Sequence, residues 1–120
     1  MNKVQALNTF WSSFGLKAYD ETSVPDDAVL PYITYESSMD DFDHKIALTA
    51  SLWYRSFSWE SIELKQLDIA NSIGKGGVIV PYDNGSVWIA KGNPWAQRMS
   101  DTSDDAIRRI VLNVEVEFLD

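Results

Sequence analysis

The chain has 120 residues, a formal net charge of −8 and no cysteine. This length predicts a single domain, residues 1–120, and the lack of thiols excludes disulfides, cysteine zinc sites and a thiolate nucleophile. The excess of carboxylates argues against specific nucleic-acid binding, and no apolar run approaches the roughly 20 residues of a membrane helix, so we expect a soluble protein made in a reducing cytoplasm.

The first predicted element is an amphipathic helix over residues 3–14, which Gly15 ends. Its apolar arc consists of Val4, Leu7, Phe10, Trp11 and Phe14. This arc should lie on an apolar surface made by later elements of the chain. Residues 16–30 carry two acidic clusters and Pro25, and we expect them to be irregular.

Two strands are expected next, joined by the polar loop 37–43. Pro31 opens the first, residues 32–36, and because proline has no amide hydrogen to donate, such strands often lie at a sheet edge. Apolar residues alternate in the second, residues 45–56, as in a half-buried strand. Its core-facing residues are Ile46, Leu48, Ala50, Leu52 and Tyr54. The two strands should form an antiparallel hairpin.

A central helix is predicted over residues 59–73. Ser58 is a suitable N-cap, and Gly74 is suited to the position just after the helix. The arc that should face the sheet carries Trp59, Ile62, Gln66, Ile69, Ala70 and Ile73. Leu64 and Leu67 lie well off this arc, on a flank that a monomer would leave in water.

A hairpin and a long strand are predicted for the C-terminal part. Strands at 78–81 and 86–91 flank Asn84-Gly85, a pair that accepts the positive φ angles of a type I′ turn. Residues 92–98 are expected to form a loop that interrupts the second of these strands, and residues 99–105 an acidic segment. The core-facing residues of the last strand are Ile110, Leu112, Val114, Val116 and Phe118.

The predicted order is therefore α-β-β-α-β-β-β. Two strand-rich halves around one central helix indicate an α+β fold, with a mainly antiparallel sheet of about five strands and two helices packed on one face. The sequence has no internal repeat, low-complexity tract or linker.

No constellation of residues indicates catalysis. The single histidine, His44, follows an acidic run at a loop–strand boundary, and no Gly-x-Ser-x-Gly elbow supplies a nucleophile. Residues 38–44 lack the alternating ligands and central glycine of a calcium loop. The glycine-rich residues 74–77 follow a helix, whereas a phosphate loop precedes one. We therefore expect no enzyme, and no catalytic, cofactor-binding or metal-binding residue.

Five tryptophans exceed what one modest core requires. Trp11 and Trp59 lie on core-facing arcs and are expected to pack there. The other three fall on the polar side of a strand, in a hairpin and in a loop, where burial under a local loop and exposure to a partner both remain open. Tryptophan and arginine are typical anchors of protein–protein contacts. The candidate interface residues are Leu64, Leu67, Trp53, Trp88, Trp95 and Arg98.

These features together resemble a known family. The N-terminal helix, the segment Leu52-Trp-Tyr-Arg-Ser-Phe57 and the pattern Glu63-x-Lys65-x-x-Asp68-Ile69-x-x-x-Ile73 are similar to tail-terminator and head–tail joining (minor capsid) proteins. Those proteins belong to long-tailed, non-contractile phages and prophages of Gram-positive bacteria. In them, too, a glycine-rich exit from the helix leads to a hairpin and a long final strand.

The resemblance implies a structural virion protein of the tail or neck, assembled in the bacterial cytoplasm. Such proteins form a homo-oligomeric ring, commonly hexameric, that caps the tail tube and meets the head–tail connector protein. A ring needs two unlike surfaces, and the zones around Leu64/Leu67 and around Trp88/Trp95 would supply them. The acidic clusters of the expected loops serve solvation, and would also let DNA pass through without binding.

Three alternatives remain. The protein could be a head-side adaptor or stopper of the same particle, or a small cytoplasmic protein-interaction module unrelated to phage. A small enzyme would need a pocket that brings His44 to a serine or a carboxylate.

Overall fold

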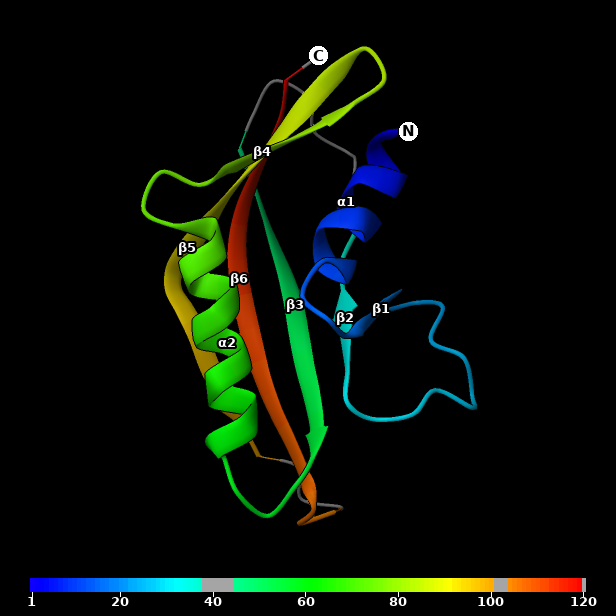
Figure 1. Cartoon of the computed structure of the whole chain (residues 1–120), viewed down its shortest axis with the longest axis vertical. Coiled ribbons are helices and arrows are strands. Elements are labelled where there is room, and N and C mark those ends of the chain that lie inside the picture. Colours follow the sequence, from blue (N-terminus) through cyan, green and yellow to red (C-terminus); the bar gives the residue numbers. More distant parts are fainter. Residues whose placement is uncertain (38–44, 101–103, 120) are drawn as a thin grey trace.

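The computed structural model describes residues 1–37, 45–100 and 104–119. Two helices and six strands follow one another along the chain (Figure 1). Their bounds are α1 (Lys3–Ser12), β1 (Lys17–Asp20), β2 (Tyr32–Tyr35), β3 (Ile46–Arg55), α2 (Glu60–Ile73), β4 (Val78–Tyr82), β5 (Gly85–Met99) and β6 (Ile107–Leu119).

The strands form one mixed sheet in the order β1-β2-β3-β6-β5-β4. All neighbours pair antiparallel except β1 and β2, which are parallel. The α+β class is confirmed, but the sheet is mixed and has six strands where a mainly antiparallel sheet of about five strands was predicted, because β1 forms within the segment expected to be irregular. With β1 outside it, β2 is not the edge strand that Pro31 led us to expect. A four-residue strand is too short to show an alternating pattern.

Strand β5 runs through the residues expected to form a loop. Lys91 pairs with Val114 and Ala96 with Leu112, so the four residues between Lys91 and Ala96 lie opposite Asn113 alone. A Cβ atom on Gly92 would lie 2.9 Å from the carbonyl oxygen of Asn113, so the close approach of the two strands requires glycine there. The predicted interruption is thus a large bulge inside one long strand.

The β4–β5 hairpin is confirmed, but its turn differs from the expected type I′. Tyr82 pairs with Gly85, so the turn residues are Asp83 and Asn84. Asn84 has a φ of 69°, and Gly85 already belongs to β5. A type I′ turn needs positive φ at both central residues, and Asp83 does not have it.

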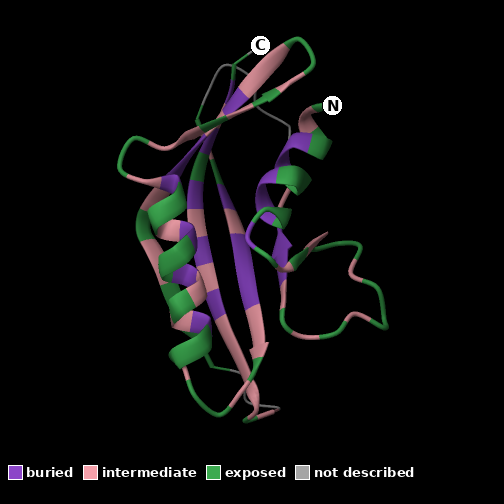
Figure 2. Ribbon diagram, viewed as in Figure 1, coloured by how far each residue is buried: buried purple, intermediate pink, exposed green. Residues whose placement is uncertain are grey.

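Both helices lie on the same side of the sheet, and the core lies between them and the sheet (Figures 1 and 2). The alternation predicted for β3 and β6 is confirmed, since Leu48, Ala50 and Leu52 are buried together with all five predicted residues of β6. The sheet-facing arc of α2 is confirmed as well, through its buried residues Ile62, Gln66, Ile69 and Ile73. The N-cap of α2 is Trp59, one residue later than predicted, while the Ser58 hydroxyl still accepts the Glu60 amide at 3.1 Å.

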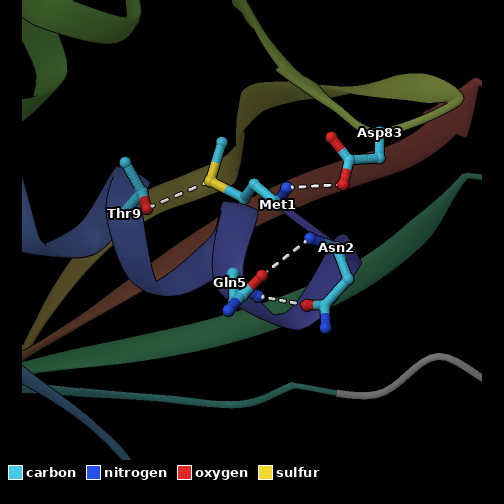
Figure 3. Close-up of polar contacts among 5 residues, drawn as sticks. All are labelled: Met1, Asn2, Gln5, Thr9 and Asp83. Carbon is cyan, nitrogen blue, oxygen red and sulfur yellow. Dashed lines mark hydrogen bonds and ion pairs between the residues drawn. The ribbon is translucent and has the colours of Figure 1, made fainter.

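Helix α1 begins with a capping box, in which Asn2 and Gln5 each accept the other's backbone amide (Figure 3). Its apolar arc is turned slightly from the prediction, because Val4 is 51% exposed and Ala6 is buried instead. The ammonium group of Met1 lies 2.7 Å from the Asp83 carboxylate, and the Asp83 amide donates to the Met1 carbonyl oxygen at 2.6 Å. The start of α1 is therefore attached to the β4–β5 turn (Figure 3).

Candidate functional site

The sheet has a second face that neither helix covers, and we call it the open face. It carries the strand residues that alternate with the core-facing ones, because successive side chains of a strand point to opposite sides of the sheet. Among its residues are Thr49, Ser51, Trp53, Trp88, Arg109, Val111 and Asn113, and Glu115 and Glu117 of β6 lie on it as well. Trp53 and Trp88, two of the predicted interface residues, thus lie on the side of the sheet opposite to α2.

Trp53 and Arg109 form an ordered pair at one end of the open face. They are register partners on β3 and β6, and the guanidinium group of Arg109 lies 4.6 Å from the centre of the Trp53 ring. The Trp53 indole donates to the Thr34 hydroxyl at 2.9 Å, and the Arg109 Nε donates to the Ser51 hydroxyl at 3.1 Å. These contacts hold an aromatic ring and a cation at fixed positions on the surface.

Trp88 marks the other end of the open face. Its indole donates to the Gly76 carbonyl at 2.9 Å, and the Lys45 ammonium lies 5.2 Å from its ring centre. Ile79, its register partner on the edge strand β4, is 62% exposed. This end of the face is therefore aromatic and apolar, and it carries both a cation and the carboxylate of Glu117, the register partner of Trp88 on β6.

Leu64 and Leu67 lie on the outer side of α2, where they are 61% and 50% exposed. We define the α2 strip as Glu60, Leu64, Leu67, Asp68 and Asn71, all of them exposed. Its inner counterpart, the arc with Ile62 and Ile69, is buried against the sheet. The strip is an exposed apolar ridge with a carboxylate near each end.

Trp95 and Arg98 belong to neither surface, because they fix α2 to β5. The Trp95 indole donates to the side-chain oxygen of Gln66 at 2.9 Å. Arg98 lies 4.7 Å from the centre of the Trp59 ring and 3.4 Å from the Glu63 carboxylate. The zone of Trp88 and Trp95 envisaged from the sequence is therefore divided between the two faces of the sheet.

The remaining polar clusters are small. Asp20 accepts hydrogen bonds from the hydroxyl and the amide of Thr22 and from the hydroxyl of Ser37. The Thr22 hydroxyl, more than the Thr22 amide and Ser37, lowers the pKa of this carboxyl below its usual 3.8. Burial raises the pKa of Tyr54. Among the described residues no group of three or more His, Cys, Asp or Glu side chains is arranged to hold a metal ion. His44 and the acidic run before it lie outside the described residues.

One groove of about 480 Å³ lies on the helix side of the molecule. It is bounded by both helices and β4, with an apolar lining from Phe10, Phe14, Val78 and Val80. Asp68 provides its charged group, and Thr9, Ser13 and Ser72 provide hydroxyls. In the part of the chain that the structure describes, neither helix has the length and hydropathy needed to cross a bilayer.

Sequence reasoning missed two residues of the open face, Arg109 and Ile79. Arg109 alternates with the core residues of its strand, so its outward direction could be predicted. Its contact with Trp53 could not, because 56 residues separate the two and the pairing depends on which strand lies beside β3. Ile79 stands in a short apolar run that gave no indication of which side faces water.

No protein-family model matches this sequence, and no curated protein matches it. A solved structure, the virion of a native gene transfer agent (GTA) particle, contains a chain with a similar fold. The TM-score is 0.66 at 13% sequence identity, and the match covers 99% of this chain and 87% of that chain. At this identity the likeness shows a shared fold.

Proposed function

We propose that this protein is a structural, non-catalytic component of a phage-like virion. In this proposal six copies assemble into a homo-oligomeric ring that caps the tail tube and joins it to the head–tail connector. The particle is a phage or prophage of a Gram-positive host, and assembly takes place in the host cytoplasm.

The observation that carries this proposal is the pair of unlike exposed surfaces on opposite sides of one small domain. A closed ring is built from a heterologous interface, in which one patch of each copy meets a different patch of the next. The α2 strip and the open face are two such patches. The fold shared with a chain of a virion particle supports the same class of protein.

The overall charge fits a ring that DNA traverses. Eighteen acidic and ten basic side chains leave a net charge of −8. Such a surface repels the phosphate backbone and releases no condensed counterions, so DNA passes without specific binding.

Native mass spectrometry of the purified protein, alone and with the tail tube protein, tests the proposal. We expect a discrete ring, and electron microscopy should show it at one end of each tube, with tube growth halted. Binding to a portal-side protein and not to the tube protein would indicate the head-side adaptor or stopper instead. A protein that stays monomeric at high concentration, even with tube protein added, would overturn the ring.

A further inference from the structure

We infer that the α2 strip of one copy packs on the open face of the next copy. This inference rests on the proposed function, in which copies associate through unlike surfaces, and it assigns the two halves of the contact. Each copy would then contact one neighbour through its α2 strip and the other neighbour through its open face.

The orientation of the two surfaces suits such a repeat. The molecule measures 44 × 31 × 23 Å, and in the view down the shortest axis α2 lies in front of the sheet (Figure 1). The open face is the other side of that sheet, because the core fills the space between sheet and helices. The strip and the open face therefore point in opposite directions, so neither can be occupied by the other within one copy.

The charges of the two surfaces are complementary at the Trp53–Arg109 end of the open face. Glu60 stands on the α2 strip, as does Asp68, which lies 3.8 Å from Lys65 of its own helix. The open face presents Arg109 at one end, and at the other both Lys45 and the carboxylates of Glu115 and Glu117, so the contact sets a strip carboxylate against Arg109. Neither of these two cations has a carboxylate partner among the described residues. Complementary charge of this kind orients two surfaces and excludes wrong pairings.

The length of α2 also agrees with the distance between the two tryptophans of the open face. Trp53 and Trp88 lie opposite Arg109 and Glu117, eight residues apart on β6, which corresponds to about 26 Å along the strand. Helix α2 has 14 residues and is therefore about 21 Å long. Between the two tryptophans the open face carries the short side chains of Thr49, Ser51 and Val111, together with Asn113 and Glu115. A helix of this length fits between the two aromatic ends.

Covering the Trp53–Arg109 end of the open face leaves few hydrogen-bond donors without partners, whereas the carboxylates of Glu115 and Glu117 on β6 would have to stay in contact with water. The indole groups of Trp53 and Trp88 and the Nε of Arg109 already donate hydrogen bonds within the subunit. Their removal from water thus does not create unsatisfied donors, which is the main cost of covering polar surface. The resulting arrangement places each α2 between two sheets, its own and that of the next copy, a layered packing that buries both sides of the helix.

Two variants, each lacking one half of the contact, test the inference. Leu64→Glu/Leu67→Glu removes the α2 strip, and Arg109→Glu/Val111→Glu removes the open face. Each is expected to be monomeric alone, whereas their mixture should give a 1:1 dimer that grows no further, because one intact strip and one intact open face remain. Val29→Glu is the matched control, since Val29 is 79% exposed in the loop between β1 and β2 and should leave the ring intact.

Cross-linking gives a second readout that does not depend on buried charge. The natural chain has no cysteine, so Leu67→Cys/Val111→Cys introduces one thiol on each surface. Oxidation should yield a ladder of linked chains for this double variant, a dimer for the mixed single variants and no linkage for Leu67→Cys alone. Leu67→Cys/Val29→Cys serves as the control and should give no ladder.

The possible results separate the two proposals. If the wild-type protein forms a ring but the ladder is absent, or Leu67→Cys alone dimerises, the ring stands and this interface is wrong. If the wild-type protein is monomeric even with tube protein, the proposed function itself fails, and this interface fails with it. A ladder together with dimers in the variant mixture would support both.

Discussion

Gly92 is a position at which a single atom decides the geometry of the sheet. It lies at the start of the bulge in β5, where the backbone of β6 approaches so closely that a Cβ atom would come within 2.9 Å of the Asn113 carbonyl oxygen. Backbone cannot move aside as a flexible side chain can, so the two strands would have to separate. The bulge in turn positions the end of β5, including Trp95 and Arg98, under α2.

Gly92→Ala is therefore expected to destabilise the protein by about 1–3 kcal/mol, the usual range for overpacking at a tight site. Gly76→Ala is the matched control, because a Cβ atom at Gly76 would meet nothing within 4 Å. Urea denaturation of both variants measures the difference. Equal midpoints for the two variants would show that the strands tolerate a wider separation here.

The carboxyl of Asp20 makes the stability of the β1 end dependent on pH. Its folded-state pKa is lowered, mainly by the Thr22 hydroxyl, so its ionised form stabilises the folded protein above the ordinary pKa of 3.8. This stabilisation is lost as the pH falls through the lowered folded-state pKa. Asp20→Asn should thus cost of order 1 kcal/mol at pH 7 and progressively less in acid. Thermal unfolding from pH 7 to pH 2 measures this, with Asp26→Asn in the following loop as the control.

At the scale of elements, α2 is attached to the sheet by polar contacts as well as by its buried arc. Gln66 is a buried polar residue within that arc, and its side-chain oxygen accepts the Trp95 indole proton. Arg98 and Arg108 both place their guanidinium groups over the Trp59 ring at the start of the helix. These contacts fix how far the α2 strip stands out from the molecule.

Trp95→Phe should destabilise the protein by about 1–3 kcal/mol, because the Gln66 oxygen is then buried without a donor. Adding Gln66→Met should recover much of this loss, since both polar partners are then replaced by apolar groups. A double-mutant cycle on urea unfolding measures the coupling. Additive effects of the two substitutions would contradict the assigned hydrogen bond.

At the scale of the whole molecule, the sheet divides the protein into two sides of different character. One side is filled by the helices and the core, and the other exposes tryptophans, the cations Lys45 and Arg109, the carboxylates of Glu115 and Glu117 and short polar residues. The exposed carboxylates of α2 face away from Arg109, so attraction between them acts between molecules and not within one. Self-association should therefore depend on both apolar contact and charge.

We expect Arg109→Gln to raise the dissociation constant of the assembly several-fold at 50 mM NaCl and by less at 500 mM NaCl, because salt screens the attraction at Arg109 while the apolar contacts persist. Sedimentation velocity of the wild type and the variant over a range of protein concentrations measures this at each salt concentration. The comparison with the wild type removes the repulsion between copies of net charge −8, which is nearly the same for both proteins. An equal effect of the substitution at both salt concentrations would show that Arg109 makes no charge contact across the interface.

Elements with a local signal could be predicted from the amino-acid sequence. Alternation in β3 and β6 and the 3.6-residue period of α2 give each of these elements one apolar side, so their type, approximate bounds and core-facing residues could be predicted. The exposure of Leu64 and Leu67 follows from the same period, because they lie off the buried arc.

Features that depend on which strands are neighbours could not be predicted from the sequence and become visible in the fold. The parallel pairing of β1, the bulge that keeps β5 continuous and the contact of Trp53 with Arg109 all join segments distant in sequence. The same holds for Trp88 and Arg98, which are ten positions apart and would share one side of a regular strand, because the bulge between them turns Arg98 to the helix side of the sheet. A local sequence pattern indicates whether a side chain is buried, but strand order and register determine which residues it contacts.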